Sequence, residues 1–144
     1  MHQRQRGFTL IEIMVVVVIL AVLGALVVPK ILENVDKARV TRAQADIRAI
    51  QTALDLYRLD NFKYPTTEQG LQALVTQPTD PTITNYRSGG YLPSLPKDPW
   101  NNLYQYASPG AGGRDYDITS YGRDGKPGGE GYDADISTTT LDQR

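Results

Sequence analysis

The chain has no cysteine and only one histidine, His2, among its 144 residues. Without cysteine it can form neither a disulfide bond nor a thiolate metal site. A small domain then needs another means of stabilisation, and a bound metal ion is one option. Beyond His2 the chain also lacks the commonest general base and the thiol nucleophile. These absences argue against an enzyme.

The chain also lacks a strong excess of either charge. The chain has 15 Lys and Arg against 16 Asp and Glu, which gives a formal net charge of −1. Removal of Arg4 and Arg6 with an N-terminal segment would lower this charge by two, to −3. A protein that neutralises phosphates needs the opposite balance, so nucleic acid is not an expected partner.

One long stretch, residues 8–28, carries a single ionisable side chain, Glu12. As a helix these 21 residues span about 31 Å, the thickness of a bilayer core. The Val and Ile content would suit a buried strand, but strands rarely exceed about eight residues. We therefore predict a transmembrane helix over residues 8–28.

Glu12 near the start of this helix has two interpretations. It can lie close enough to the interface to reach water, or it can have a function, because a charge inside a span is costly. Residues 1–7 are short, polar and basic, and the small residue Gly7 stands before the apolar run. A secretory signal has its small residues after that run.

Residues 1–12 resemble the class III signal of type IV prepilins and pseudopilins: a basic leader, Gly7, Phe8, three residues, Glu12, then about twenty apolar residues. The resemblance implies that a membrane-embedded prepilin peptidase cuts between Gly7 and Phe8 and N-methylates Phe8. It also implies that the apolar helix stays on the mature protein. Because a buried carboxylate needs a cationic partner, we hypothesise that Glu12 pairs with the Phe8 amine of a neighbouring subunit and fixes filament register.

The helix is expected to continue beyond the membrane, over residues 29–61. Gly24 and Pro29 predict a kink or local melting, because proline cannot donate to the helical ladder; the resemblance adds that this segment unwinds when subunits pack. A hinge at the membrane surface is the simpler alternative. An apolar stripe follows at helical spacing: Ala43, Ile47, Ile50, Leu54 and Tyr57.

Basic residues flank this helix on both sides of the membrane. Arg4 and Arg6 are expected in the cytoplasm by the positive-inside rule, which puts residues 62–144 in the periplasm. Four basic residues at the start of segment 29–61 are interpreted as a solvated face, with attraction to anionic lipid as the alternative: Lys30, Lys37, Arg39 and Arg42.

The remaining residues, 62–144, predict a small mixed region. A threonine close to Pro65, followed by Glu68 and Gln69, predicts the start of a short helix that ends at Pro78, with Leu71, Leu74 and Val75 on its apolar face. An ordered surface loop is expected over 79–99, with Trp100 as a core anchor. Alternation of aromatic and polar residues predicts strands near 103–106 and 116–121, paired as an antiparallel hairpin. The fold class is α+β and pilin-like: a long N-terminal transmembrane and amphipathic helix packed on a small antiparallel sheet.

Three stretches narrow the resemblance: residues 64–74 (YPTTEQGLQAL), 95–100 (LPKDPW) and 120–125 (SYGRDG). They are similar to the major pseudopilin family of the bacterial type II secretion system. Type IVa pilins usually carry a C-terminal cysteine pair, which this chain lacks. Two departures from the family are Asn101, where glycine is common, and the absence of a tryptophan shortly after Ile136.

Residues 121–136 form an acidic, glycine-rich loop. Carboxylates on such a loop suit Ca²⁺, but the spacing is not that of an EF-hand, because Lys126 and Gly128 occupy ligand positions. From the residues alone, a solvated turn is the commoner outcome. The resemblance implies one structural Ca²⁺, held by Asp124 and Asp135 and by the carbonyls of Tyr121 and Lys126. Asp133 is a further candidate and Glu130 an alternative, because the loop length varies in the family.

The resemblance implies a structural function: polymerisation into the periplasmic pseudopilus, which supports export of folded proteins across the outer membrane. The implied partners are further copies of the chain, the prepilin peptidase, minor pseudopilins, the inner-membrane assembly platform and the membrane. Alternatives are a type IV pilin and a membrane-anchored calcium-binding protein that never polymerises. A hydrolase using Asp124 and Asp135 is a third.

Overall fold

The computed structural model describes residues 7–142. Most of the predicted leader, with Arg4 and Arg6, lies outside these residues. The described chain divides into two compact units, one ending at Asp36 and one beginning at Lys37. The apolar side chains of the first unit are exposed, whereas those of the second unit form a core.

Helix α1 (Leu10–Asn61) is a single run of 52 residues and ends at the predicted position. In the first unit its apolar side chains have no covering layer. Leu10 is 82% exposed, and Ile19 and Val27 are both 52% exposed. Among the described residues α1 is the one helix long and apolar enough to cross a membrane. This finding fits the predicted span, although α1 begins at Leu10 rather than at Phe8.

Gly24 and Pro29 both lie within the helical run of α1. The chain on its own therefore shows no melting there. Because the unwinding was expected when subunits pack together, it stays a prediction about the assembled state.

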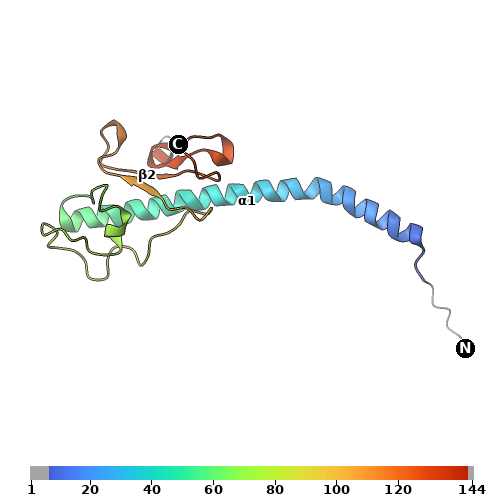
Figure 1. The fold of residues 1–144 in the computed structure, drawn as a ribbon, viewed down its shortest axis with the longest axis horizontal. Coiled ribbons are helices and arrows are strands. Elements are labelled where there is room, and N and C mark those ends of the chain that lie inside the picture. Colours follow the sequence, from blue (N-terminus) through green and yellow to red (C-terminus); the bar gives the residue numbers. More distant parts are fainter. Residues whose placement is uncertain (1–6, 143–144) are drawn as a thin grey trace, which may run out of the picture. The chain divides into compact units, whose positions relative to one another are not determined.

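The second unit is built on the C-terminal half of α1, which Figure 1 shows alongside strand β2. The predicted stripe is confirmed, since all five of its side chains are buried, and Ala53 joins them. They share one core with Leu74 of η1 (Leu71–Leu74), with Ile118 of β2 (Asp117–Ser120) and with Ile136 of β3 (Ile136–Ser137).

The sheet has three antiparallel strands in the order β1-β2-β3. The predicted hairpin is confirmed: β1 (Gln105–Ala107) pairs with β2, with Tyr106 opposite Ile118. The sequence analysis missed β3, in which Ile136 lies opposite Ser120, and the short helix α2 (Thr138–Asp142) that follows it. Two further 3-10 helices are η2 (Ala111–Gly113) and η3 (Gly131–Asp133).

The C-terminal segment packs through threonine rather than tryptophan. Thr138 is buried, donates its hydroxyl to Asp117 Oδ1 (3.3 Å) and accepts from the Ile118 N–H (3.4 Å). Leu141 packs against the core. These contacts occupy the end of the chain where the family tryptophan was expected.

The long connection between η1 and β1 is ordered, as predicted. Leu92 and Leu95 pack against the core, and so do Ile83 and Tyr86, which the sequence analysis did not single out. Trp100 is partly buried against the same core.

Candidate functional site

The N-terminal end of α1 is closed by a reciprocal capping box between Thr9 and Glu12. The Glu12 N–H donates to Thr9 Oγ1 (3.3 Å), and the Thr9 N–H donates to Glu12 Oε2 (3.4 Å). This is the Thr-x-x-Glu pattern that satisfies two orphan donors of a helix start. The sequence analysis missed it, although the spacing was visible. Glu12 therefore has a local partner before any neighbouring subunit is present.

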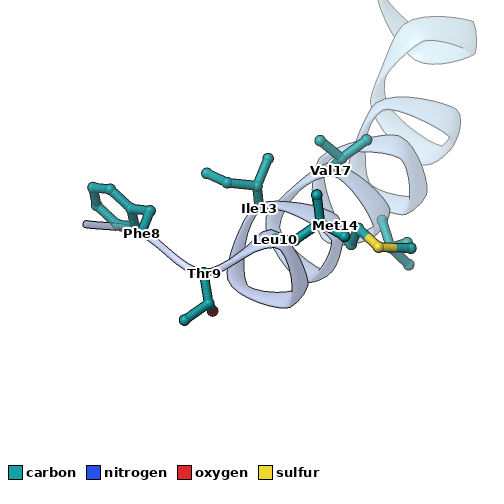
Figure 2. A pocket seen from close by; sticks show the side chains of 7 residues that line it. Phe8, Thr9, Leu10, Ile13, Met14 and Val17 are labelled. Atoms are coloured by element: carbon teal, nitrogen blue, oxygen red, sulfur yellow. The ribbon is translucent and has the colours of Figure 1, made fainter. Parts of the chain in front are cut away.

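Around this cap the first unit presents apolar side chains outwards. Figure 2 shows Phe8, Ile13 and Val17 projecting from one side of the chain in this view, with Thr9 pointing to the other side. Gly7 and Phe8 precede the helix and are exposed. A large apolar surface on one helix, with a single capped carboxylate, suits lipid or the corresponding helix of another subunit.

The acidic loop at residues 121–136 does not gather its carboxylates into one cluster. Within residues 7–142 there is no group of three or more His, Cys, Asp or Glu side chains arranged to hold a metal ion. Asp124 Oδ1 accepts from the Lys126 N–H (3.1 Å), and Asp135 Oδ2 accepts from the Gly128 N–H (3.0 Å). Both predicted acidic ligands therefore point one oxygen at loop backbone.

One carboxylate oxygen of Asp135 has no hydrogen-bond donor among the described residues. This oxygen, Oδ1, is also shielded from solvent. A buried carboxylate oxygen without a donor is costly, and a cation would satisfy it. This observation fits the calcium ion that the family resemblance implies.

Asp133 has a different environment from the other two. Its Oδ1 accepts from Arg123 Nε (2.8 Å), and its Oδ2 accepts from Arg123 Nη2 (3.1 Å). Both carboxylate oxygens are thus engaged by one guanidinium. The sequence analysis considered Asp133 only as a candidate ligand and did not anticipate this pair.

Asp98 anchors the start of the loop, and the sequence analysis missed this role. The carboxylate is 4% exposed and accepts from the N–H groups of Trp100 (3.1 Å) and Asn102 (2.8 Å). It also accepts from the Ser120 hydroxyl (2.7 Å). The turn before β1 is therefore tied to the end of β2, from which the acidic loop departs.

Asn101 at the tip of this turn has φ +71°. Asparagine tolerates this left-handed region better than other non-glycine residues. The departure from the family's glycine is therefore compatible with the same turn.

An exposed apolar helix with a capped glutamate, continuing into a helix packed on a small antiparallel sheet, defines a membrane-anchored, pilin-like subunit. Residues 2–28 match the family described as the prokaryotic N-terminal methylation motif. Residues 30–139 match the family described as type II secretion system (T2SS), protein G.

Named relatives agree with the protein G match. The chain is 58% identical over 139 residues to the type II secretion system core protein G of Vibrio cholerae, covering 96% of this chain and 94% of that protein. It is 58% identical over 136 residues to the protein of that name from Pseudomonas aeruginosa, covering 94% and 95%.

Among solved structures, the chain is similar to the major pseudopilin from the type 2 secretion system of enterohaemorrhagic Escherichia coli. The TM-score is 0.66 at 50% identity, with 75% of this chain and 88% of that chain covered. The chain belongs to the type II secretion system protein G family, and its role is that of a structural pseudopilin.

Proposed function

We propose that this chain polymerises through α1 into the pseudopilus of a type II secretion system. It is anchored in the inner membrane with residues 37–142 in the periplasm, and the filament supports export of folded proteins across the outer membrane. The observation that carries the proposal is the exposure of the first unit: none of the residues in the most apolar stretch of α1 is buried. Lipid covers this surface before assembly, and neighbouring helices cover it afterwards.

Maturation by a prepilin peptidase precedes assembly in this proposal. The peptide bond between Gly7 and Phe8 lies in exposed, non-helical backbone, which supports access by a protease. Cleavage leaves Phe8 with a free amine, which the enzyme then methylates. The amine of one subunit pairs with Glu12 of the next, and the Thr9 cap holds Glu12 at the helix end until that exchange.

Cysteine crosslinking tests polymerisation, and the native chain supplies a cysteine-free background. A chain that carries both Val16→Cys and Leu23→Cys, produced in cells with the secretion system and then oxidised, should give a ladder of covalent oligomers. A control chain that keeps Val16→Cys but carries Leu23→Ser should give no ladder. Monomers or isolated dimers alone would instead support the membrane-anchored protein that never polymerises.

We also propose that the acidic loop holds one structural Ca²⁺, bound by Asp124 and Asp135 and by the carbonyls of Tyr121 and Lys126. The buried Asp135 Oδ1 without a donor supports this site. Residues 121–136 contain four acidic and two basic side chains, so their net charge of −2 balances a divalent cation. The ion would crosslink a glycine-rich loop in a chain that has no disulfide.

Calorimetric titration of the full-length chain in dodecyl maltoside tests the ion. After removal of metal with EGTA, CaCl₂ should bind with a stoichiometry of one, and Asp135→Asn should abolish the heat. Absence of binding to the native chain would favour the interpretation of the loop as a solvated turn.

The minor pseudopilins and the assembly platform are proposed as partners on family membership alone, as part of the polymerisation proposal.

A further inference from the structure

The acidic loop is closed by an ion pair whose geometry is unusually complete for a surface site. Arg123 and Asp133 form two parallel N–H···O bonds of 2.8 and 3.1 Å, with their side chains 49% and 32% exposed. A backbone hydrogen bond lies next to this pair, since the Arg123 N–H donates to the carbonyl of Tyr132, the residue before Asp133 (3.0 Å). Bidentate pairs of this kind fix geometry more firmly than ordinary surface pairs do.

The backbone at Gly122 and at Gly129 also lies close to the backbone of Asp133. A Cβ on Gly122 would lie 2.9 Å from the Asp133 carbonyl oxygen, and one on Gly129 would lie 2.5 Å from that oxygen. Both glycines have positive φ. The two ends of the loop can approach this closely only because Gly122 and Gly129 have no side chain. The Arg123–Asp133 pair therefore lies where the loop closes on itself.

Closure matters because the loop between the paired residues is rich in glycine. Residues 122–131 contain five glycines, and glycine loses more backbone freedom on ordering than other residues. A restraint that orders the loop before the ion arrives removes part of that cost from binding. Asp124 and Asp135, the proposed ligands, lie immediately after Arg123 and two residues after Asp133.

We infer that Arg123 and Asp133 form a clasp that pre-organises the acidic loop for Ca²⁺ and that keeps Asp133 out of the coordination sphere. This inference rests on the proposed calcium site. Asp133 is then a positioning residue, and two carboxylates, those of Asp124 and Asp135, neutralise the ion.

Two double variants separate closure from charge. Arg123→Gln with Asp133→Asn removes the ion pair without changing the net charge. Arg123→Asp with Asp133→Arg also keeps the net charge and exchanges the positions of the two partners. In calorimetric titration of the full-length chain in detergent with CaCl₂, the first should bind about tenfold more weakly, since ordering the open loop then opposes binding. The reversed pair should recover most of that loss.

A matched control uses an ion pair elsewhere in the second unit. Arg87 and Asp60 lie 3.2 Å apart with side chains 47% and 29% exposed. Arg87→Gln with Asp60→Asn should leave calcium affinity unchanged, because this pair is not part of the loop.

Proteolysis of the calcium-free chain gives a second readout that does not depend on binding. Glu130 is the one glutamate between residues 121 and 136, so a glutamate-specific protease reports opening of the loop. Without the clasp, cleavage after Glu130 should be several-fold faster, because local opening controls the rate. The reversed pair should be cut at nearly the native rate.

The results distinguish this inference from the calcium proposal beneath it. If the native chain binds no Ca²⁺, both fail. If the native chain binds Ca²⁺ and the neutral double variant binds and is cleaved as the native chain is, the clasp is refuted and the calcium site stands. Loss of binding in Asp133→Asn as complete as in Asp135→Asn, with no loss in Arg123→Gln, would make Asp133 a ligand and also overturn the inference.

Discussion

At the scale of single residues, Glu12 has two partners at two stages. Before assembly it caps its own helix through Thr9, with bonds of 3.3 and 3.4 Å. In the proposed filament it pairs with the Phe8 amine of a neighbour. Capping needs only an acceptor at this position, whereas pairing needs a negative charge.

Glutamine and alanine at position 12 therefore have different meanings. Glu12→Ala removes both roles and should still be processed, yet it should give at least tenfold fewer filaments, since one buried ion pair is worth several kcal/mol when broken. Glu12→Gln keeps the cap acceptor and should fail to a similar extent. Processing is read from N-terminal sequencing and filament yield from the sheared fraction. Normal yield from Glu12→Gln would show that capping alone is needed.

Two tyrosines in the core differ in what their hydroxyls contact. Tyr106 donates to the Pro65 carbonyl at 2.8 Å, whereas the Tyr57 hydroxyl is buried without a hydrogen-bond partner among the described residues. Burial is the main cause that raises the pKa of each to about 12. Both hydroxyls are therefore neutral at physiological pH, and only one is satisfied.

Removal of these hydroxyls should have opposite outcomes. Tyr106→Phe should lower the free energy of unfolding by about 1 kcal/mol, because the Pro65 carbonyl loses its donor. Tyr57→Phe should be neutral or stabilising, because it removes an unsatisfied group of similar shape. Denaturant melts followed by the single tryptophan, Trp100, measure both. A loss of 1 kcal/mol or more for Tyr57→Phe would indicate a partner for that hydroxyl.

At the scale of elements, α1 is one helix with two kinds of surface. Ile47 is 0% exposed in the core of the second unit, whereas Ile19 is 52% exposed. The same substitution at these two positions should separate folding from assembly. Ile47→Ala should cost about 2–5 kcal/mol of unfolding free energy, from lost burial and a cavity.

Ile19→Ala should leave the melting of the second unit unchanged and reduce filament yield, since the Ile19 side chain lies outside the core of that unit and is half exposed in the isolated subunit. Circular dichroism melts in detergent and the sheared-filament assay give the two readouts. A melting temperature lowered equally by both variants would contradict this division of α1.

The connection between η1 and β1 is fixed by Asp80. Its carboxylate accepts from the Thr82 hydroxyl and N–H (2.6 and 2.9 Å) and from Lys63 Nζ (3.0 Å). The Thr82 hydrogen bonds, with the Lys63 contact after them, hold the pKa of Asp80 well below its usual range. A depressed pKa means that the carboxylate stabilises the fold above its unfolded pKa and loses this effect as the pH falls toward the folded value.

Asp80→Asn should therefore lower the melting temperature at pH 7 and have a smaller effect at pH 2, where the unfolded carboxyl is already protonated. The difference between native and variant chains should begin to shrink below about pH 5, where the unfolded carboxyl starts to bind protons. Melts of both chains from pH 7 to pH 2 measure this difference. A difference that stays constant over the range would show that Asp80 is not held in its charged form.

At the scale of the whole molecule, the sequence predicts what depends on local pattern. The stripe from Ala43 to Tyr57 follows helical periodicity, and the hairpin follows alternation of aromatic and polar residues, so both were predictable. Strand β3 has two residues and is defined by its pairing with β2, in which Ser120 lies opposite Ile136. No local pattern specifies so short a strand.

The candidate site divides in the same way. The cleavage motif and the acidic loop are contiguous and could be read directly. The contact of Asp98 with Ser120 joins residues 22 positions apart, and the pair of Arg123 with Asp133 depends on the turn of a glycine-rich loop. Such contacts follow from the closed chain rather than from spacing, which is why Asp133 was considered only as a ligand.

Calcium, in this proposal, stabilises the second unit as a whole, because the acidic loop joins β2 to β3. A ligand at 100 times its dissociation constant adds about 2.7 kcal/mol to the free energy of unfolding. For a domain of about 100 residues this corresponds to a rise of several degrees or more in Tm. The loop and the C-terminal segment should therefore melt later when the ion is bound.

Thermal melts of the full-length chain in detergent, with CaCl₂ and then with excess EGTA, should show this rise and its loss. Asp124→Ala and Asp135→Asn should melt alike in both conditions, at about the Tm of the native chain in EGTA. MgCl₂ should give a much smaller rise, because Mg²⁺ requires a tighter octahedral site than a flexible loop offers. Identical native melts in CaCl₂ and EGTA would mean that Thr138, Leu141 and the β2–β3 pairing hold the C-terminal segment without a metal ion.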